Sequence, residues 1–144
     1  MTEQVIGLDP GVNTGYAVWD RKQGRFLRVE SMPIHEAMDA VRATHAAGLL
    51  HSVDFEDARL RTWFGKADAR EARSGAGIRE GVGSVKRDCG IWAEFLTALG
   101  VTFRPRKPTA GSTKWTAEQF AKVAKWPHRT NVHGRDAALL ILGR

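Results

Sequence analysis

Cysteine is almost absent from this sequence, since Cys89 is the only one among 144 residues. A single cysteine excludes a disulfide within the chain and a zinc site made of several cysteine thiolates. A chain without disulfides suits a reducing compartment, and we therefore expect the protein to work in the cytoplasm.

Long apolar runs are also missing. No stretch approaches the roughly 20 consecutive apolar residues that a transmembrane helix needs. The N-terminus lacks the basic segment followed by an apolar one that is typical of a secretory signal. Repeats, low-complexity tracts and linkers are not visible either. We therefore expect residues 1–144 to form one domain that neither enters a membrane nor is exported.

Negative charge is scarcer than positive charge. The chain carries 22 Lys and Arg against 16 Asp and Glu, which gives a net charge of +6. Such a balance favours a polyanionic partner such as nucleic acid. A basic surface without a specific partner would give the same composition.

The spacing of apolar residues predicts an α/β fold. Strands are predicted at residues 4–9, 16–19, 25–31, 51–56 and 102–105, and helices at 34–50, 84–99, 116–125 and 131–142. Residues 57–82 are expected to form a long, partly helical loop, and 106–114 a basic loop. The first three strands can pair as an antiparallel meander, while the last two arrive through helices and must be parallel. This predicts a five-stranded mixed sheet in the order 3-2-1-4-5, flanked by helices.

The segment from Gln4 to Trp19 is the most informative part of the chain. A strand-prone run delivers Asp9 to its C-terminal end, Pro10-Gly11 breaks the strand, and Asn13-Thr14-Gly15 has turn chemistry. An acid at a rigid strand tip beside a glycine turn can hold a metal or a phosphate. The alternative is an ordinary hairpin in which Asp9 only caps the turn.

Other chemically active side chains are predicted to meet Asp9. Glu56 ends the fourth strand, which lies parallel to the first, and His133 and Asp136 share one face of the last helix. Carboxylates that crowd together repel one another unless cations bind among them. Hard oxygen ligands suit Mg²⁺ or Mn²⁺, and two such ions can drive phosphodiester cleavage.

Two of these assignments have competitors. Asp54 and Asp57 are the neighbours of Glu56, and strand alternation places Asp54 and Glu56 on one face and Asp57 on the other. We prefer Glu56 because it lies nearer the strand tip, with Asp57 as an outer hydrogen-bond acceptor. His133 is interpreted as a ligand or proton-transfer group, although a capping or packed histidine is the alternative.

In their order along the chain, these motifs resemble the RuvC-type Holliday junction resolvases of the ribonuclease H-like superfamily. The matching pieces are Ile6-Gly-Leu-Asp-Pro-Gly-Val-Asn-Thr-Gly15, Val53-Asp-Phe-Glu56, Gly81-Val-Gly83, Lys107, Lys114 and His133-Gly-Arg-Asp136-Ala-Ala-Leu. The resemblance covers nearly the whole chain. It implies a ribonuclease H-like fold and a Mg²⁺- or Mn²⁺-dependent endonuclease that resolves four-way junctions by paired nicks. The family's catalytic acids map onto Asp9, Glu56 and Asp136, and His133 takes a fourth position that is often Asp.

The same resemblance suggests how DNA is bound. Trp63 and Phe64 follow the fourth strand among cations, and such a pair can stack on unpaired bases. In RuvC-like resolvases an aromatic in this region helps to open the junction centre, whereas the alternative is that the pair anchors the loop on the core. The candidate phosphate contacts are Arg59, Arg61, Arg79, Lys86, Lys107 and Lys114, and the last two match the family motif. Further basic residues would extend this phosphate track, namely Arg70, Arg73, Arg87, Arg104 and Arg106.

A four-way junction is two-fold symmetric, so we expect a homodimer with two sites. The predicted helix 84–99 is the candidate contact, because Ile91, Trp92 and Phe95 exceed what one sheet face needs. The small size and high arginine content look like a phage or prophage member of the family, working in the cytoplasm of a bacterium or an infected host.

Three rival functions are compatible with parts of the sequence. The first motif also resembles the phosphate loop of actin-like ATPases, which need two such domains. A flap or generic branched-DNA nuclease would use the same acids as a resolvase. A non-cleaving module that binds branched DNA is the third rival, but it would have little use for crowded carboxylates, which are costly without a cation.

Overall fold

The computed structural model describes residues 2–61, 76–108 and 114–144. Its strands are β1 (Gln4–Asp9), β2 (Asn13–Asp20), β3 (Arg25–Pro33), β4 (Leu50–Glu56) and β5 (Phe103–Arg106). Its helices are α1 (Ile34–Ala46), the short 3₁₀ helix η1 (Ala58–Leu60), α3 (Ala76–Leu99), α4 (Ala117–Ala124) and α5 (Val132–Leu139). None of the helices in this described part is long and apolar enough to span a membrane.

The strands form one five-stranded sheet in the order β3-β2-β1-β4-β5. β2 pairs antiparallel with both β1 and β3, while β4 pairs parallel with β1 and β5. The predicted strand order is therefore confirmed. Because β1, β4 and β5 run in the same direction, their carboxyl ends, and with them Asp9 and Glu56, lie at one edge of the sheet.

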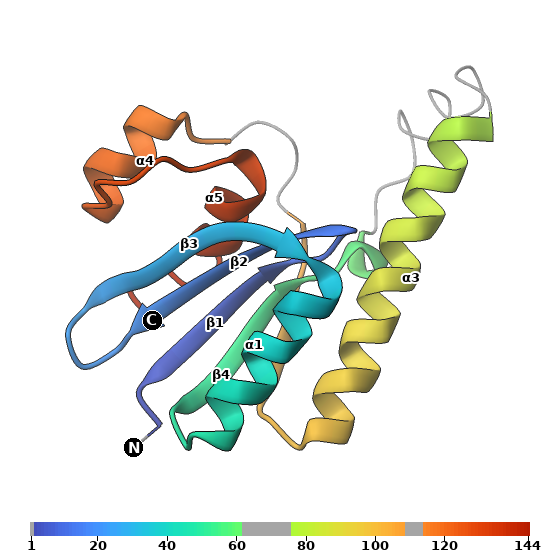
Figure 1. The fold of residues 1–144 in the computed structure, drawn as a ribbon. Helices are drawn as coiled ribbons and strands as arrows, with labels where there is room; N and C mark the ends of the chain where they lie inside the picture. Colours follow the sequence, from blue (N-terminus) through green and yellow to red (C-terminus); the bar gives the residue numbers. More distant parts are fainter. Residues whose placement is uncertain (1, 62–75, 109–113) are drawn as a thin grey trace.

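Helices cover both faces of this sheet (Figure 1). α1 and α3 lie on one face, and α4 and α5 lie on the other. Alternation along β1 divides its side chains between two cores: Ile6 and Leu8 pack with the core of α1 and α3, whereas Val5 packs with that of α4 and α5. Residues Gly7 and Asp9 therefore face α5.

The start of α3 differs from the prediction. The helix begins at Ala76 rather than at Ser84, so Gly81 and Gly83 lie inside it instead of opening it. A glycine costs a helix only about 1 kcal/mol relative to alanine, which is too little to end one that is held by tertiary contacts. Those contacts include Trp92 and Leu96, both fully buried in the core.

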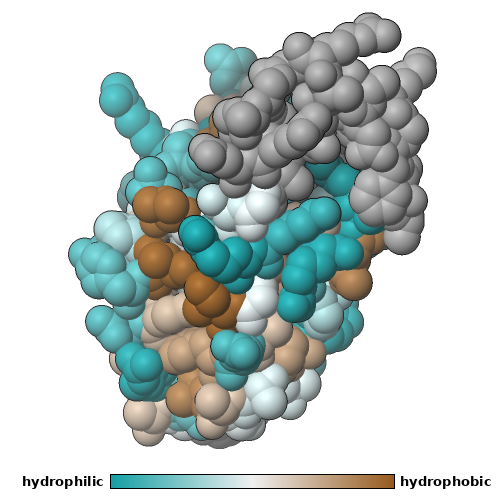
Figure 2. All heavy atoms as spheres, turned by 90° about the vertical axis from the view of Figure 1, so that its right-hand side faces the viewer, coloured by the Kyte–Doolittle hydropathy of each residue, from teal (hydrophilic) through white to brown (hydrophobic). Residues whose placement is uncertain are grey.

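The outer face of α3 also differs from the prediction. Trp92 belongs to the core and Phe95 packs against its edge, so neither forms an outward apolar face. Among the side chains of α3 that the structure describes, from Gly83 onward, the large apolar ones that are exposed are Val85 and Ile91, at 37% and 41%. Figure 2 shows hydrophobic residues in the middle of this side of the molecule, bordered by hydrophilic ones.

Smaller differences concern other boundaries. β2 starts at Asn13, so the segment Asn13-Thr14-Gly15 is strand rather than turn. α1 ends at Ala46 rather than at Leu50, which opens β4. α5 ends at Leu139 and continues as turns instead of reaching Leu142 as a helix.

Candidate active site

Helix α5 lies very close to the sheet because two strand glycines leave room for it. A Cβ atom placed at Gly15 of β2 would clash with the carbonyl oxygen of His133, and one at Gly7 of β1 would clash with that of Ala137. Gly15 pairs directly with Asp9 across the β1–β2 ladder. The first turn of α5 is thereby held against the end of β1.

The N-terminus of α5 is fixed by a side-chain cap. Oδ1 of Asn131 accepts a hydrogen bond from the backbone N–H of Gly134 at 2.8 Å, which satisfies a donor that the helix leaves unpaired. The Asn131 amide also donates to the hydroxyl of Ser31 on β3 at 2.6 Å. This anchored turn carries His133, whose Nδ1 lies 3.1 Å from Oδ2 of Asp9.

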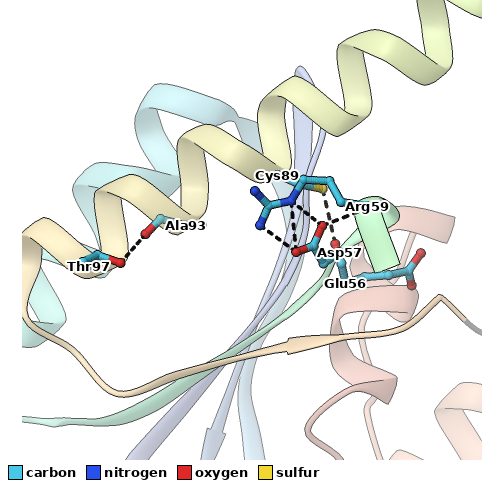
Figure 3. Close-up of polar contacts among 6 residues, drawn as sticks. All are labelled: Glu56, Asp57, Arg59, Cys89, Ala93 and Thr97. Carbon is cyan, nitrogen blue, oxygen red and sulfur yellow. Dashed lines mark hydrogen bonds and ion pairs between the residues drawn. The ribbon is translucent and has the colours of Figure 1, made fainter. Parts of the chain in front are cut away.

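Glu56 reaches the same side of the sheet from the tip of β4. The next residue, Asp57, turns to the opposite side, where it caps η1 and binds the guanidinium of Arg59 through Nε and Nη2. The thiol of Cys89 on α3 contacts the backbone oxygen of Glu56 at 3.6 Å. Figure 3 shows the Glu56 carboxylate pointing away from this group. The strand tip is thus secured on the α3 side, and Glu56 is presented on the α5 side.

The pKa values of Glu56 and Asp9 are both raised, and neighbouring acids contribute to each rise. Burial raises the pKa of Glu56 to about 7, and the negative charges of Asp9 and Asp136 add to the shift. Burial also raises the pKa of Asp9; the hydrogen bond with His133 opposes this effect and the charge of Asp136 reinforces it. Burial is thus the main reason that both carboxyls resist ionisation, and the charges of neighbouring acids add to it.

The ammonium group of Lys114 lies next to these carboxylates. Nζ of Lys114 is 3.4 Å from Oδ2 of Asp136, whose side chain is 19% exposed. Lys114, Lys107 and Arg61 line a pocket of about 360 Å³ whose wall includes Glu56 and Asp136. Three of the predicted phosphate contacts are therefore placed beside the predicted catalytic acids.

The donor set suits a hard divalent cation. Asp9, Glu56 and Asp136 offer carboxylate oxygens and His133 offers an imidazole, and a cation would offset the repulsion among the carboxylates. Within the described residues, no three such side chains already stand at the mutual spacing of a formed metal centre. The four side chains therefore do not form a closed set of ligands in this structure.

The acids that compete with Glu56 have other partners. Asp54 is fully buried and paired with Arg104 and Arg106, and Asp57 is bonded to Arg59. Burial opposes the ionisation of Asp57, but its hydrogen bonds with Arg59 hold its pKa below the usual value. Of the three acids, Glu56 is the one in electrostatic contact with Asp9 and Asp136.

The remaining predicted DNA contacts are distributed differently. Arg59 binds Asp57 on the α3 side, and Lys86 lies on α3, which also carries Arg79. Trp63 and Phe64 fall outside the described residues. The sequence analysis placed Arg106 among the basic residues of a phosphate track, and in the structure Arg106 lines the acidic pocket. The prediction assigned Arg106 to the loop after the fifth strand, whereas it is the last residue of β5 and pairs with Glu56.

Comparisons with known proteins agree with this fold. No protein-family model matches the chain, and no curated protein matches its sequence. Among solved structures, T. thermophilus RuvC in complex with a Holliday junction substrate is similar, with a TM-score of 0.59 and 16% sequence identity. The match covers 97% of this chain and 90% of that chain. The chain therefore has the ribonuclease H-like fold of RuvC, built on a mixed sheet in the order 3-2-1-4-5.

Proposed function

We propose that this chain is a metal-dependent endonuclease that cuts branched DNA and resolves four-way junctions by paired nicks. The observation that carries the proposal is the meeting of Asp9, Glu56 and Asp136 at one sheet edge, where the charge of Asp136 adds to the rise in the pKa of both other acids. The adjoining cationic pocket supports a phosphodiester as the substrate group. The fold and the net charge of +6 agree with a nucleic-acid partner.

Asp9, Glu56 and Asp136 would hold two Mg²⁺ or Mn²⁺ ions, with His133 as a further ligand or proton-transfer group. Bound metal supplies an activated water and offsets the charge on the cleaved phosphate. Asp9 would orient His133 by accepting a hydrogen bond from Nδ1–H. In the tautomer that carries its hydrogen on Nδ1, Nε2 is the nitrogen that can accept a proton. Lys114 orients Asp136 and offsets part of its charge.

We further propose that two copies of this single nuclease domain act together. Opposing nicks on a two-fold symmetric junction require two sites with the same symmetry, which a C₂ dimer supplies. Val85 and Ile91 on the outer face of α3 are the candidate contact, in place of the buried Trp92. The composition agrees with a phage or prophage enzyme that works in the cytoplasm.

The decisive experiment incubates end-labelled four-way, flap and duplex DNA with the protein in Mg²⁺, in Mn²⁺ and in EDTA. We expect paired symmetric nicks on the four-way junction with either metal, and none in EDTA. Asp9→Asn should abolish cleavage and keep junction binding, because the basic surface supplies most of the affinity.

Other cleavage patterns would favour one of the rival functions. One-sided cuts on flaps indicate a flap nuclease, and junction binding without any cutting indicates a binding module. Light scattering with and without a junction tests the dimer. A monomer mass in both states contradicts paired cleavage by a dimer.

A further inference from the structure

Asp54 is a fully buried carboxylate on β4 that two arginines share. Arg104 donates to it through Nε at 3.2 Å and through Nη2 at 2.7 Å, and Arg106 donates through Nη1 at 2.9 Å. A buried carboxylate needs a cation, and the fork of Arg104 already binds both of its oxygens. Arg106 therefore adds a positive charge beyond what Asp54 requires.

The two arginines are equally exposed to solvent but lie at different positions relative to the candidate active site. Each side chain is 41% exposed. The β4–β5 register places Arg104 opposite Asp54 and Arg106 opposite Glu56. Arg106 lines the 360 Å³ pocket with Glu56 and Asp136, and Arg104 is not among the described residues that line it.

Arg106 is also fixed from the side of α5. Its Nη1 lies 3.4 Å from the backbone oxygen of Leu140, just after that helix. Among the described residues, no ion pair joins Arg106 to Glu56 or Asp136. Its hydrogen bonds within this part of the chain use Nη1 alone, and a guanidinium has five donors on three nitrogens. A cation is thus held beside the acids without being neutralised by them.

The geometry points to Arg106 as the residue that binds the phosphate at the candidate active site, with its N–H groups donating to nonbridging oxygens of the phosphodiester that enters the pocket. This inference rests on the proposed nuclease function. A planar guanidinium matches two phosphate oxygens, and a donor that is already fixed stabilises charge that grows on them during cleavage. Asp54 is the positioning residue, because it holds the guanidinium at the pocket.

Arg104 provides a matched control, since it binds the same carboxylate and is equally exposed. Single-turnover cleavage of a four-way junction in Mg²⁺ compares Arg106→Ala with Arg104→Ala. We expect Arg106→Ala to slow cleavage about 100-fold, as does the loss of one donor from an oxyanion site, and Arg104→Ala to change it little. Thermal unfolding of both variants controls for lost packing. Equal cleavage rates in the two variants would overturn the assignment.

A second measurement does not depend on cleavage. In the Asp9→Asn background, anisotropy titrations use junctions with a neutral methylphosphonate at single positions around the branch point. We expect one position to weaken binding about 10-fold when Arg106 is present and to have no effect on Arg106→Ala, because that contact is already missing. The same loss in both proteins would contradict a phosphate contact. If the unsubstituted protein cuts no DNA, the proposed function fails, and this scan still decides the role of Arg106.

Discussion

His133 and Asp9 lie 124 residues apart in the chain, and their side chains meet at 3.1 Å between Nδ1 and Oδ2. The contact joins the first turn of α5 to the end of β1, so the candidate site exists only when the last helix is docked. The side chain of His133 is 57% exposed and that of Asp9 is 17% exposed. An exposed imidazole tied to a mostly buried carboxylate is well placed to exchange protons with solvent and substrate.

Removal of this imidazole should impair the reaction rather than the fold. We expect His133→Ala to slow cleavage about 10- to 100-fold, as is typical when a group that orients a metal ligand is lost. His133→Asp should restore part of the rate by supplying a carboxylate. Mn²⁺ should support cleavage by the unsubstituted protein better than Mg²⁺, because imidazole suits softer ions.

Single-turnover rates in both metals test this prediction, with His45→Ala on the exposed side of α1 as the control. Full activity of His133→Ala in both metals would exclude His133 from the reaction.

Gly15 tests whether the close approach of α5 matters. A methyl group there meets the carbonyl oxygen of His133, so Gly15→Ala must push the helix away and separate His133 from Asp9. We expect a loss of about 1 to 3 kcal/mol in the free energy of unfolding and a large loss of cleavage. Gly83→Ala is the control, because its Cβ meets no atom within 4 Å and alanine favours a helix.

Urea unfolding and cleavage assays on the two variants measure both effects. An unchanged unfolding free energy in Gly15→Ala would show that α5 tolerates a wider spacing.

The strand order could be predicted from the sequence because it follows from local signals and handedness. A meander of three strands and two helical crossovers leave few alternatives. The strand-tip positions of Asp9 and Glu56 follow from the same pattern. Gly15 was interpreted as turn chemistry, whereas it lies within β2 and makes room for α5, since sequence patterns do not show which backbones approach closely.

The roles of the arginines depend on tertiary contacts and were harder to predict from the sequence. Arg59 is predicted to contact a phosphate, and the structure adds that a buried carboxylate two residues earlier binds its guanidinium. Arg104 and Arg106 alternate on β5 and meet Asp54 only because β5 pairs with β4. Arg104 and Asp54 are 50 residues apart in the sequence, and no local periodicity predicts a contact over that separation.

Lys107 and Lys114 line the acidic pocket and should contact phosphates of the bound DNA. Replacement of either by alanine should weaken junction binding and reduce the slope of log affinity against log salt by about one unit, since one counterion fewer is released. Lys22, in the turn after β2 at the opposite end of that strand from the site, is the control. Anisotropy titrations over a range of salt concentrations measure the slope. Slopes equal to that of Lys22→Ala would reduce both lysines to ordinary surface charges.

The raised pKa of Glu56 predicts how stability depends on pH in the absence of metal. The pKa moves from 4.5 to about 7 on folding, so between these values the folded protein binds more protons than the unfolded chain. Stability contributed by protonated Glu56 is complete below pH 4.5 and is lost as the pH rises through about 7.

Glu56→Gln keeps the uncharged form at every pH, so the variant should unfold with a higher free energy than the unsubstituted protein at pH 8 and with a similar one at pH 4.5. The expected difference at pH 8 is about 1 to 2 kcal/mol, reduced from the full shift because the carboxyl is only partly buried. Mg²⁺ or Mn²⁺ should cancel the advantage, because a bound cation favours the ionised acids and stabilises only the protein that binds it. Urea unfolding at both pH values, in EDTA and in Mn²⁺, measures these four differences, with the exposed Glu94→Gln as the control. A variant that is no more stable at pH 8 in EDTA would contradict the crowding of carboxylates on which a metal site depends.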